Sequence, residues 1–128
     1  MTDALRRLAG KVEEYCRESG EKIFVLPDEP MSRHTSFRIG GPAGLFLAPE
    51  SECAFAALVR MAGDAGVRTF ILGNGSNVLF DDAGFDGAVV STGALDRIRV
   101  DGNAIEAGAG ASLSAVCKAA RDASLAGL

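Results

Sequence analysis

The sequence has 128 residues, 48% of them hydrophobic and 23% charged, which suits one globular domain with a buried core rather than two domains. The formal net charge is −4 and there is no dense Lys/Arg run, which argues against binding to nucleic acid or to an anionic membrane surface. No stretch is long and apolar enough to span a membrane, and the N-terminus lacks the apolar core of a signal peptide, so we expect a cytoplasmic protein.

An amphipathic helix is predicted at the start of the chain, over residues 3–19, because apolar residues recur there at steps of three and four. Thr2 can cap its start, and Gly20 can end it in the left-handed conformation. The next elements predicted are a short extended run over 22–27 and a polar connection over 28–36.

The middle of the chain predicts a β–α–β unit with parallel strands, because a strand, a helix and a second strand follow one another at the usual spacing. Ser51 is a suitable N-cap for the helix, and Gly66 can close it. The predicted elements are a strand over 45–48, a helix over 52–65 and a strand over 68–72.

A hairpin and a third helix are predicted after a further strand over 88–91. The hairpin joins 97–100 to 104–107, and the Asp-Gly pair between them is typical of a type I′ turn with positive φ at both central residues. Ser112 can cap the third helix, whose buried side is expected to carry Leu113, Val116, Cys117 and Ala120. These elements together predict an α/β (α+β) fold.

Few side chains in the sequence indicate catalysis. Cys16, Cys53 and Cys117 lack CxxC spacing and fall in predicted helices, so we interpret them as reduced core thiols rather than as disulfides or a zinc site. His34 is the only histidine, and we expect it to be a solvated loop residue. Arg38 could meet a phosphate or a carboxylate, or it could be an exposed strand residue. We therefore predict no catalytic residue and no metal site.

The loop Gly-Asn-Gly-Ser-Asn over residues 73–77 is the most informative segment. Its glycines let the backbone turn sharply and approach a ligand without a Cβ in the way. Successive amides can then converge on a phosphate, with Ser76 and Asn77 as neutral donors. The alternative is a tight turn between two strands, and the residues alone leave both open. A second small-residue loop, over 108–111, precedes a helix N-terminus that could face an anion, although a packing turn is the simpler interpretation.

Four segments in order resemble the family of UDP-N-acetylenolpyruvoylglucosamine reductases, flavoenzymes of peptidoglycan precursor synthesis. They are HTSFRIGGPA (34–43), ILGNGSNVLF (71–80), GFDGAVV (84–90) and AGAGASL (107–113). The resemblance implies an FAD-binding domain of the vanillyl-alcohol oxidase/PCMH type, with the flavin between two subdomains. The divisions it implies are an N-terminal helix over 1–20, a first subdomain over 21–92 and an incomplete second subdomain over 93–128.

The resemblance also implies the cofactor site and the reaction. The FAD pyrophosphate would be held by backbone amides of the first loop, and the second loop would lie along the cofactor. The residues concerned are Gly73, Asn74, Gly75, Ser76 and Asn77, with Gly108, Ala109 and Gly110. The family transfers hydride from NADPH to FAD and then to UDP-N-acetylglucosamine-enolpyruvate, which gives UDP-N-acetylmuramate.

The catalytic groups of that family lie in a later part, which this sequence lacks. They are an arginine that stabilises the enol intermediate, a Ser or Cys proton donor and a glutamate. We therefore expect a truncated chain that is inactive by itself and that self-associates through uncovered apolar surface. The alternatives are a non-catalytic module that binds FAD or another dinucleotide, and another flavin oxidoreductase of the same wider group.

Overall fold

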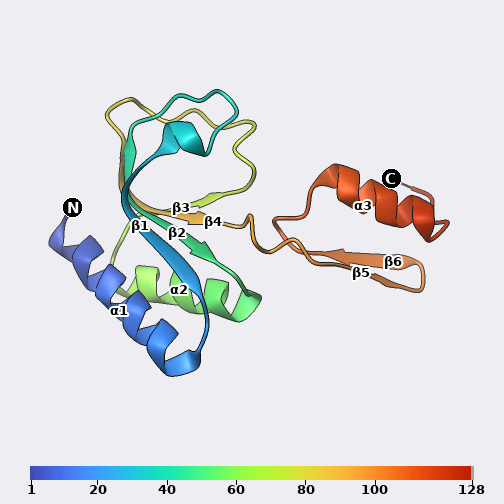
Figure 1. Cartoon of the computed structure of the whole chain (residues 1–128), viewed down its shortest axis with the longest axis horizontal. Helices are drawn as coiled ribbons and strands as arrows, with labels where there is room; N and C mark the ends of the chain where they lie inside the picture. The colour runs from blue at the N-terminus through green and yellow to red at the C-terminus, as the bar shows by residue number, and fades with distance from the viewer. Residues whose placement is uncertain (128) are drawn as a thin grey trace.

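The computed structural model describes residues 1–127, so that Leu128, the last residue of the predicted second subdomain, lies outside it. Figure 1 shows a lobe of four strands and two helices beside a smaller lobe of a hairpin and one helix. We call these the sheet lobe (α1, α2, β1–β4) and the hairpin lobe (β5, β6, α3). In chain order the elements are α1 (Asp3–Ser19), β1 (Ile23–Pro30), the 3₁₀ helix η1 (Met31–Arg33), β2 (Pro42–Pro49), α2 (Glu52–Asp64), β3 (Thr69–Leu72), β4 (Phe85–Ser91), β5 (Ile98–Asp101), β6 (Ala104–Ala107) and α3 (Leu113–Asp122).

Helix α1 confirms the first predicted helix together with both of its ends. The hydroxyl oxygen of Thr2 accepts a hydrogen bond from the Leu5 amide at 3.3 Å, which satisfies one of the free donors at the helix start. Gly20 ends the helix with φ +77°, the left-handed conformation that glycine adopts without a steric penalty.

The sheet has the strand order β1-β2-β4-β3. Strands β2 and β3 both pair in parallel with β4, which lies between them, and β1 pairs antiparallel with β2. The predicted β–α–β unit is therefore confirmed, with a later strand inserted between its two strands. The parallel arrangement brings the carboxyl ends of β2, β3 and β4 to the same edge of the sheet.

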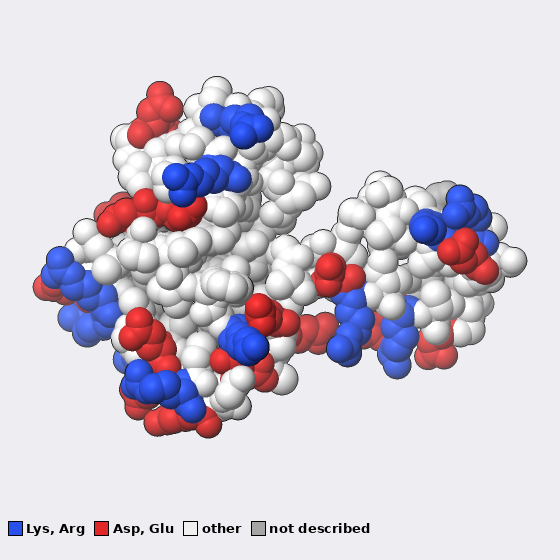
Figure 2. Space-filling view, in the orientation of Figure 1, with Lys and Arg blue, Asp and Glu red and all other residues white. Residues whose placement is uncertain are grey.

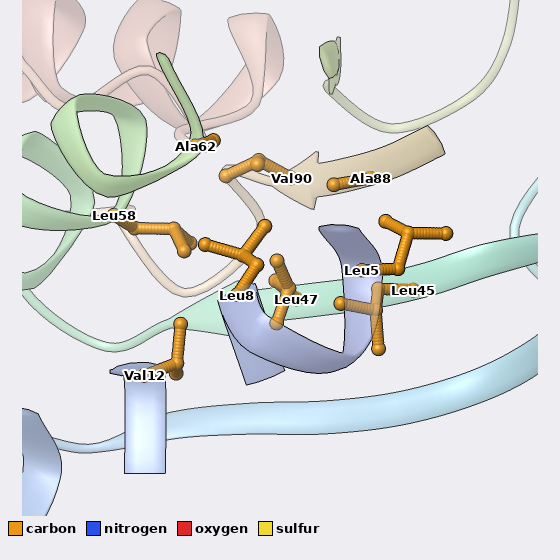
Figure 3. Close-up of a cluster of buried hydrophobic side chains, with 9 residues drawn as sticks. All are labelled: Leu5, Leu8, Val12, Leu45, Leu47, Leu58, Ala62, Ala88 and Val90. Carbon is orange, nitrogen blue, oxygen red and sulfur yellow. The ribbon is translucent and has the colours of Figure 1, made fainter. Parts of the chain in front are cut away.

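Helices α1 and α2 cover one face of the sheet. Figure 3 shows their apolar side chains packed over β2 and β4, in a cluster formed by Leu5, Leu8, Val12, Leu45, Leu47, Leu58, Ala62, Ala88 and Val90. Loops cover much of the other face, where the buried cluster is Met31, Ala43, Phe46, Leu72, Phe80 and Val89. Burial on both faces explains the nearly continuous apolar runs of β2 and β4.

For residues 22–41 one prediction is wrong, and so is one of the two alternatives left open for Arg38. Strand β1 continues to Pro30 instead of ending near Pro27, because β1 is an edge strand, where a proline without an amide hydrogen is tolerated. Arg38 is not a strand residue. It lies in a turn with φ +56°, and its amide donates to the Thr35 carbonyl at 3.1 Å.

The hairpin lobe confirms the predicted hairpin but not its turn type. Asp101 pairs with Ala104, so Gly102 and Asn103 are the central residues, and only Gly102 has positive φ. That pattern is typical of a type II′ turn, which needs glycine at its first central position alone.

Helix α3 forms as predicted, and the Ser112 hydroxyl accepts from the Ala115 amide at 3.2 Å. Its predicted buried side is confirmed for Ala120, which is buried, and wrong for Leu113 and Cys117, which are exposed. Val116 is half-buried. The interpretation of the cysteines as core thiols is also wrong for Cys53 and Cys117. Cys53 is exposed as well, and Cys16 is half-buried.

Residues 1–127 lack two further kinds of feature. No helix in this range has the length and apolar character needed to cross a membrane. Nor does the described chain bring three or more His, Cys, Asp or Glu side chains together as ligands for a metal ion.

Candidate functional site

An open cleft of about 320 Å³ lies where β3 and β4 end. In parallel α/β sheets this edge is where ligands usually bind. The cleft brings residues 33–36, at and after the end of η1, next to residues at the ends of β3 and β4. Its lining is Arg33, His34, Thr35, Ser36, Phe46, Leu72, Gly73, Asn74 and Ser91. Two of the sequence-predicted site residues, Gly73 and Asn74, therefore line it.

The 73–77 loop leaves most of its amides free. The side-chain oxygen of Asn74 accepts from the Ser76 amide at 3.2 Å and from the Ser76 hydroxyl at 2.9 Å, which holds the loop in a tight turn. In the described chain the other four amides of the loop donate to no protein group. Free amides of consecutive residues are the donor set that suits a phosphate.

Gly75 is required by the packing of the protein itself. Its carbonyl accepts from the Ser36 amide at 3.0 Å, and it adopts φ +74°. A Cβ at this position would overlap the carbonyl oxygen of His34. The loop is thus docked against residues 34–36, and a side chain at Gly75 would disturb that docking whether or not a ligand binds.

Gly73 differs from Gly75, because no protein atom lies within 4 Å of the place where its Cβ would be. It lines the cleft, and its φ is not in the left-handed region. The argument that glycine permits close approach of a ligand therefore applies to Gly73 rather than to Gly75.

His34 is not the solvated loop residue that the sequence indicated. Its ring is stacked on Phe46, with centroids 4.0 Å apart and planes inclined by 18°. Its Nε2 lies 3.2 Å from Oε1 of Glu29, which Arg33 also approaches at 3.5 Å. Nothing in the local sequence indicates this environment, because Phe46 reaches His34 only through the fold.

The second predicted loop connects β6 to α3 within the hairpin lobe and does not line the cleft. Cβ atoms at Gly108 and Gly110 would overlap the carbonyl oxygens of Leu95 and Thr92, so both glycines serve packing within the protein. Thr92 nevertheless connects the two loops. Its buried hydroxyl lies 3.4 Å from the carbonyl oxygens of Leu72 and Ala109 and can donate to either.

Charges of both signs are interspersed over the face of the molecule that Figure 2 shows, and no broad patch of one sign marks a binding site on that face. The cleft itself carries a positive charge, because Arg33 is the only side chain of fixed charge among its lining residues. Guanidinium, hydroxyl and backbone donors together fit a pyrophosphate, which offers only acceptor oxygens.

Comparison with known proteins decides the family. The family model described as "FAD binding domain" matches residues 43–127, most of the chain and both predicted loops. The chain belongs to the FAD binding domain family. The prediction of FAD as the cofactor is confirmed by this membership, as is the fold class.

Curated relatives of this FAD binding domain carry the name UDP-N-acetylenolpyruvoylglucosamine reductase. The protein from Caldicellulosiruptor bescii is 40% identical over 116 residues, which cover 91% of this chain and 36% of the relative. The one from Geobacter sulfurreducens is 38% identical over 123 residues, covering 95% of this chain and 39% of the relative. The chain therefore spans a little more than a third of the length of these relatives, and the predicted family resemblance is confirmed.

A solved structure shows the same fold. A variant of the Physcomitrella patens BBE-like 1 protein superposes with a TM-score of 0.59 at 18% identity, over 88% of this chain and 26% of that protein. At that identity the likeness extends to the fold alone.

Proposed function

We propose that the cleft binds the pyrophosphate of FAD through the 73–77 loop, with Arg33 and Ser36 as further lining donors. The observation that carries this proposal is the free amides of the loop beside Gly73, where open space replaces a Cβ. The 108–110 loop is then a support of the site, since Thr92 connects it to the end of β3.

We further propose that the chain supplies the cofactor-binding part of an NADPH-dependent reductase in the cytoplasm. Its substrate would be UDP-N-acetylglucosamine-enolpyruvate and its product UDP-N-acetylmuramate, as the resemblance and the names of the relatives suggest. When bound, FAD would supply the hydride-transfer chemistry between NADPH and the enolpyruvyl group. The chain's own residues would bind and orient the cofactor. Loop amides would donate hydrogen bonds to the pyrophosphate, and the buried side chains of Phe46 and Leu72 would keep water from the base of the cleft.

The test of FAD binding is Gly73→Ala, measured as FAD affinity by flavin fluorescence anisotropy on the purified chain. A methyl group at Gly73 meets no protein atom, so the fold should keep its circular dichroism spectrum and its stability. It would occupy the space where we place the pyrophosphate. We expect the FAD dissociation constant to rise by about tenfold or more, the equivalent of one lost charge-assisted hydrogen bond.

Gly63→Ala is the matched control. A methyl group at Gly63 would also have no neighbouring atom within 4 Å, but Gly63 lies in α2, away from the cleft. This control should bind FAD like the unchanged chain and be slightly more stable, because alanine favours a helix. Equal FAD affinity of the two variants would refute the cleft as the pyrophosphate site. A chain that binds no FAD would refute the proposed function as a whole.

The reductase proposal has a separate assay. By itself the 128-residue chain should oxidise NADPH only at the background rate when UDP-N-acetylglucosamine-enolpyruvate is added, because no residue of this sequence matches the proton donor, the arginine or the glutamate of the family's later part. Substrate-dependent turnover by this chain would contradict the proposal that the chain binds the cofactor but does not catalyse the reaction by itself.

A further inference from the structure

His34 occupies an environment that the FAD proposal leaves unexplained. It lines the cleft, yet its ring is held by two contacts outside the 73–77 loop: the stack on Phe46 and the hydrogen bond between Nε2 and Glu29. Glu29 itself does not line the cleft, and its side chain is only 13% exposed. A partly buried carboxylate loses solvation, and its pairing with His34 and Arg33 offsets the free-energy cost of that loss.

The bond to Glu29 determines what the rest of the ring can do. When Nε2–H donates to a carboxylate, Nδ1 is an acceptor in the neutral ring and becomes a second donor when the ring gains a proton. In the described chain Nδ1 makes no hydrogen bond to a protein group. The ring is therefore fixed in orientation with one nitrogen left for a partner other than the protein.

We propose that His34 contacts the pyrophosphate of the bound cofactor and that Glu29 is a positioning residue that fixes the His34 ring for this contact. This inference rests on the proposed FAD site. His34 lies beside the 73–77 loop and lines the same cleft, since the Ser36 amide donates to the Gly75 carbonyl and the backbone of His34 packs on Gly75.

The proposal predicts a pH dependence. The charged groups that face His34 are Glu29 from β1 and Arg33 from η1, while β2 contributes the uncharged Phe46 and the 73–77 loop has no ionisable side chain. Protonation turns Nδ1 into a donor for phosphate oxygens. Since a second donor strengthens the contact with phosphate oxygens, FAD affinity should rise on the order of tenfold when the pH is lowered.

The test uses the fact that His34 is the only histidine, so that its imidazole gives one set of NMR signals. In the unchanged chain, ¹⁵N spectra should show the proton on Nε2, and both FAD and ADP should shift the signals. Adenosine, which lacks phosphate, should leave them unchanged. The same spectra recorded for Glu29→Ala should show a mixture of tautomers before any ligand is added.

Measurements of FAD affinity distinguish a role of Glu29 in positioning His34 from a role in the stability of the fold alone. His34→Gln should weaken FAD binding on the order of tenfold at the acid end and flatten the pH profile. Glu29→Ala should weaken it less, and Glu29→Gln, which keeps a hydrogen-bond acceptor, should restore part of the loss. The matched control is Glu13→Gln on the exposed side of α1, which should change neither affinity nor profile.

Two outcomes would overturn the inference. If FAD binds while the His34 signals stay unchanged and His34→Gln keeps the full pH profile, His34 has only a structural role and the FAD site stands without it. If neither FAD nor ADP binds to the unchanged chain, the proposed function fails and this inference fails with it.

Discussion

The two lobes contain helices with similar caps and similar amphipathic patterns, but these helices bury different amounts of apolar side chain. Helices α1 and α3 both begin at a side-chain cap and both have an amphipathic pattern. Helix α1 buries Leu5, Leu8 and Val12 against the sheet, whereas α3 buries only Ala120. In the described chain all other buried hydrophobic residues belong to the sheet lobe.

This difference shows that local signals specify a helix, while burial requires a partner surface of the right shape. The hairpin lobe offers α3 only the two short strands β5 and β6, and Leu113 stays exposed in consequence. We therefore expect the free energy of unfolding to come mainly from the two clusters on the faces of the four-stranded sheet.

The largest expected effect comes from truncating the core of the sheet lobe. Leu58→Ala removes a fully buried side chain between α2 and the sheet and should lower the free energy of unfolding by about 2–5 kcal/mol. The matched change in the other lobe, Leu113→Ala, should cost less than about 0.5 kcal/mol. Urea denaturation followed by circular dichroism measures both, and equal costs would show that the hairpin lobe buries Leu113 in solution.

Removing the helix caps tests the same difference between the lobes, with a smaller expected change in the free energy of unfolding. Ser51 caps α2 through a 3.0 Å bond from the Ala54 amide and also donates to Glu21 at 2.7 Å, so Ser51→Ala should cost about 1–2 kcal/mol. Ser112→Ala removes the same kind of cap from α3, but fraying of that helix exposes little buried surface. Its cost should appear as faster hydrogen exchange in α3, with the global unfolding midpoint nearly unchanged. A larger global shift for Ser112→Ala than for Ser51→Ala would contradict the assignment of stability to the sheet lobe.

The connection between the lobes should contribute about as much as one hydrogen bond. Thr92→Val keeps the shape of a buried side chain but removes the hydroxyl between Leu72 and Ala109, which should cost about 1 kcal/mol. Faster exchange at the amides of Gly108 and Gly110, which bond to Arg97 and Leu95, would report the loosening. Unchanged exchange there would mean that the backbone bonds alone hold the second loop.

The smallest effect on stability, and a distinct effect on association, is expected at the exposed face of α3. Leu113→Ser removes an exposed apolar side chain and should leave the unfolding midpoint in place. If the chain self-associates through this face, as we predict, light scattering should show a lower average mass for the variant than for the unchanged chain. The same mass for both would exclude Leu113 from the contact.

The sequence by itself determined the elements and the cofactor class, for reasons that are local. Helices were found because apolar spacing and caps act within one turn, as at Thr2 and Ser112. The hairpin was found because Asp-Gly restricts a turn to few conformations, although the choice between types I′ and II′ depended on the φ of Asn103. FAD was identified through the resemblance of four ordered segments to a family of flavoenzymes, because the loop residues alone left a tight turn equally open.

Only the tertiary structure decided which residues meet in the cleft and why each glycine is there. Gly73 and Gly75 look alike in the sequence, but one faces open space and the other packs on His34, a residue about forty positions earlier in the chain. The environment of His34 likewise depends on Phe46 and Glu29, which belong to two different strands. Such contacts are set by strand order and register, which bring together residues far apart in the chain, and no local pattern carries that information.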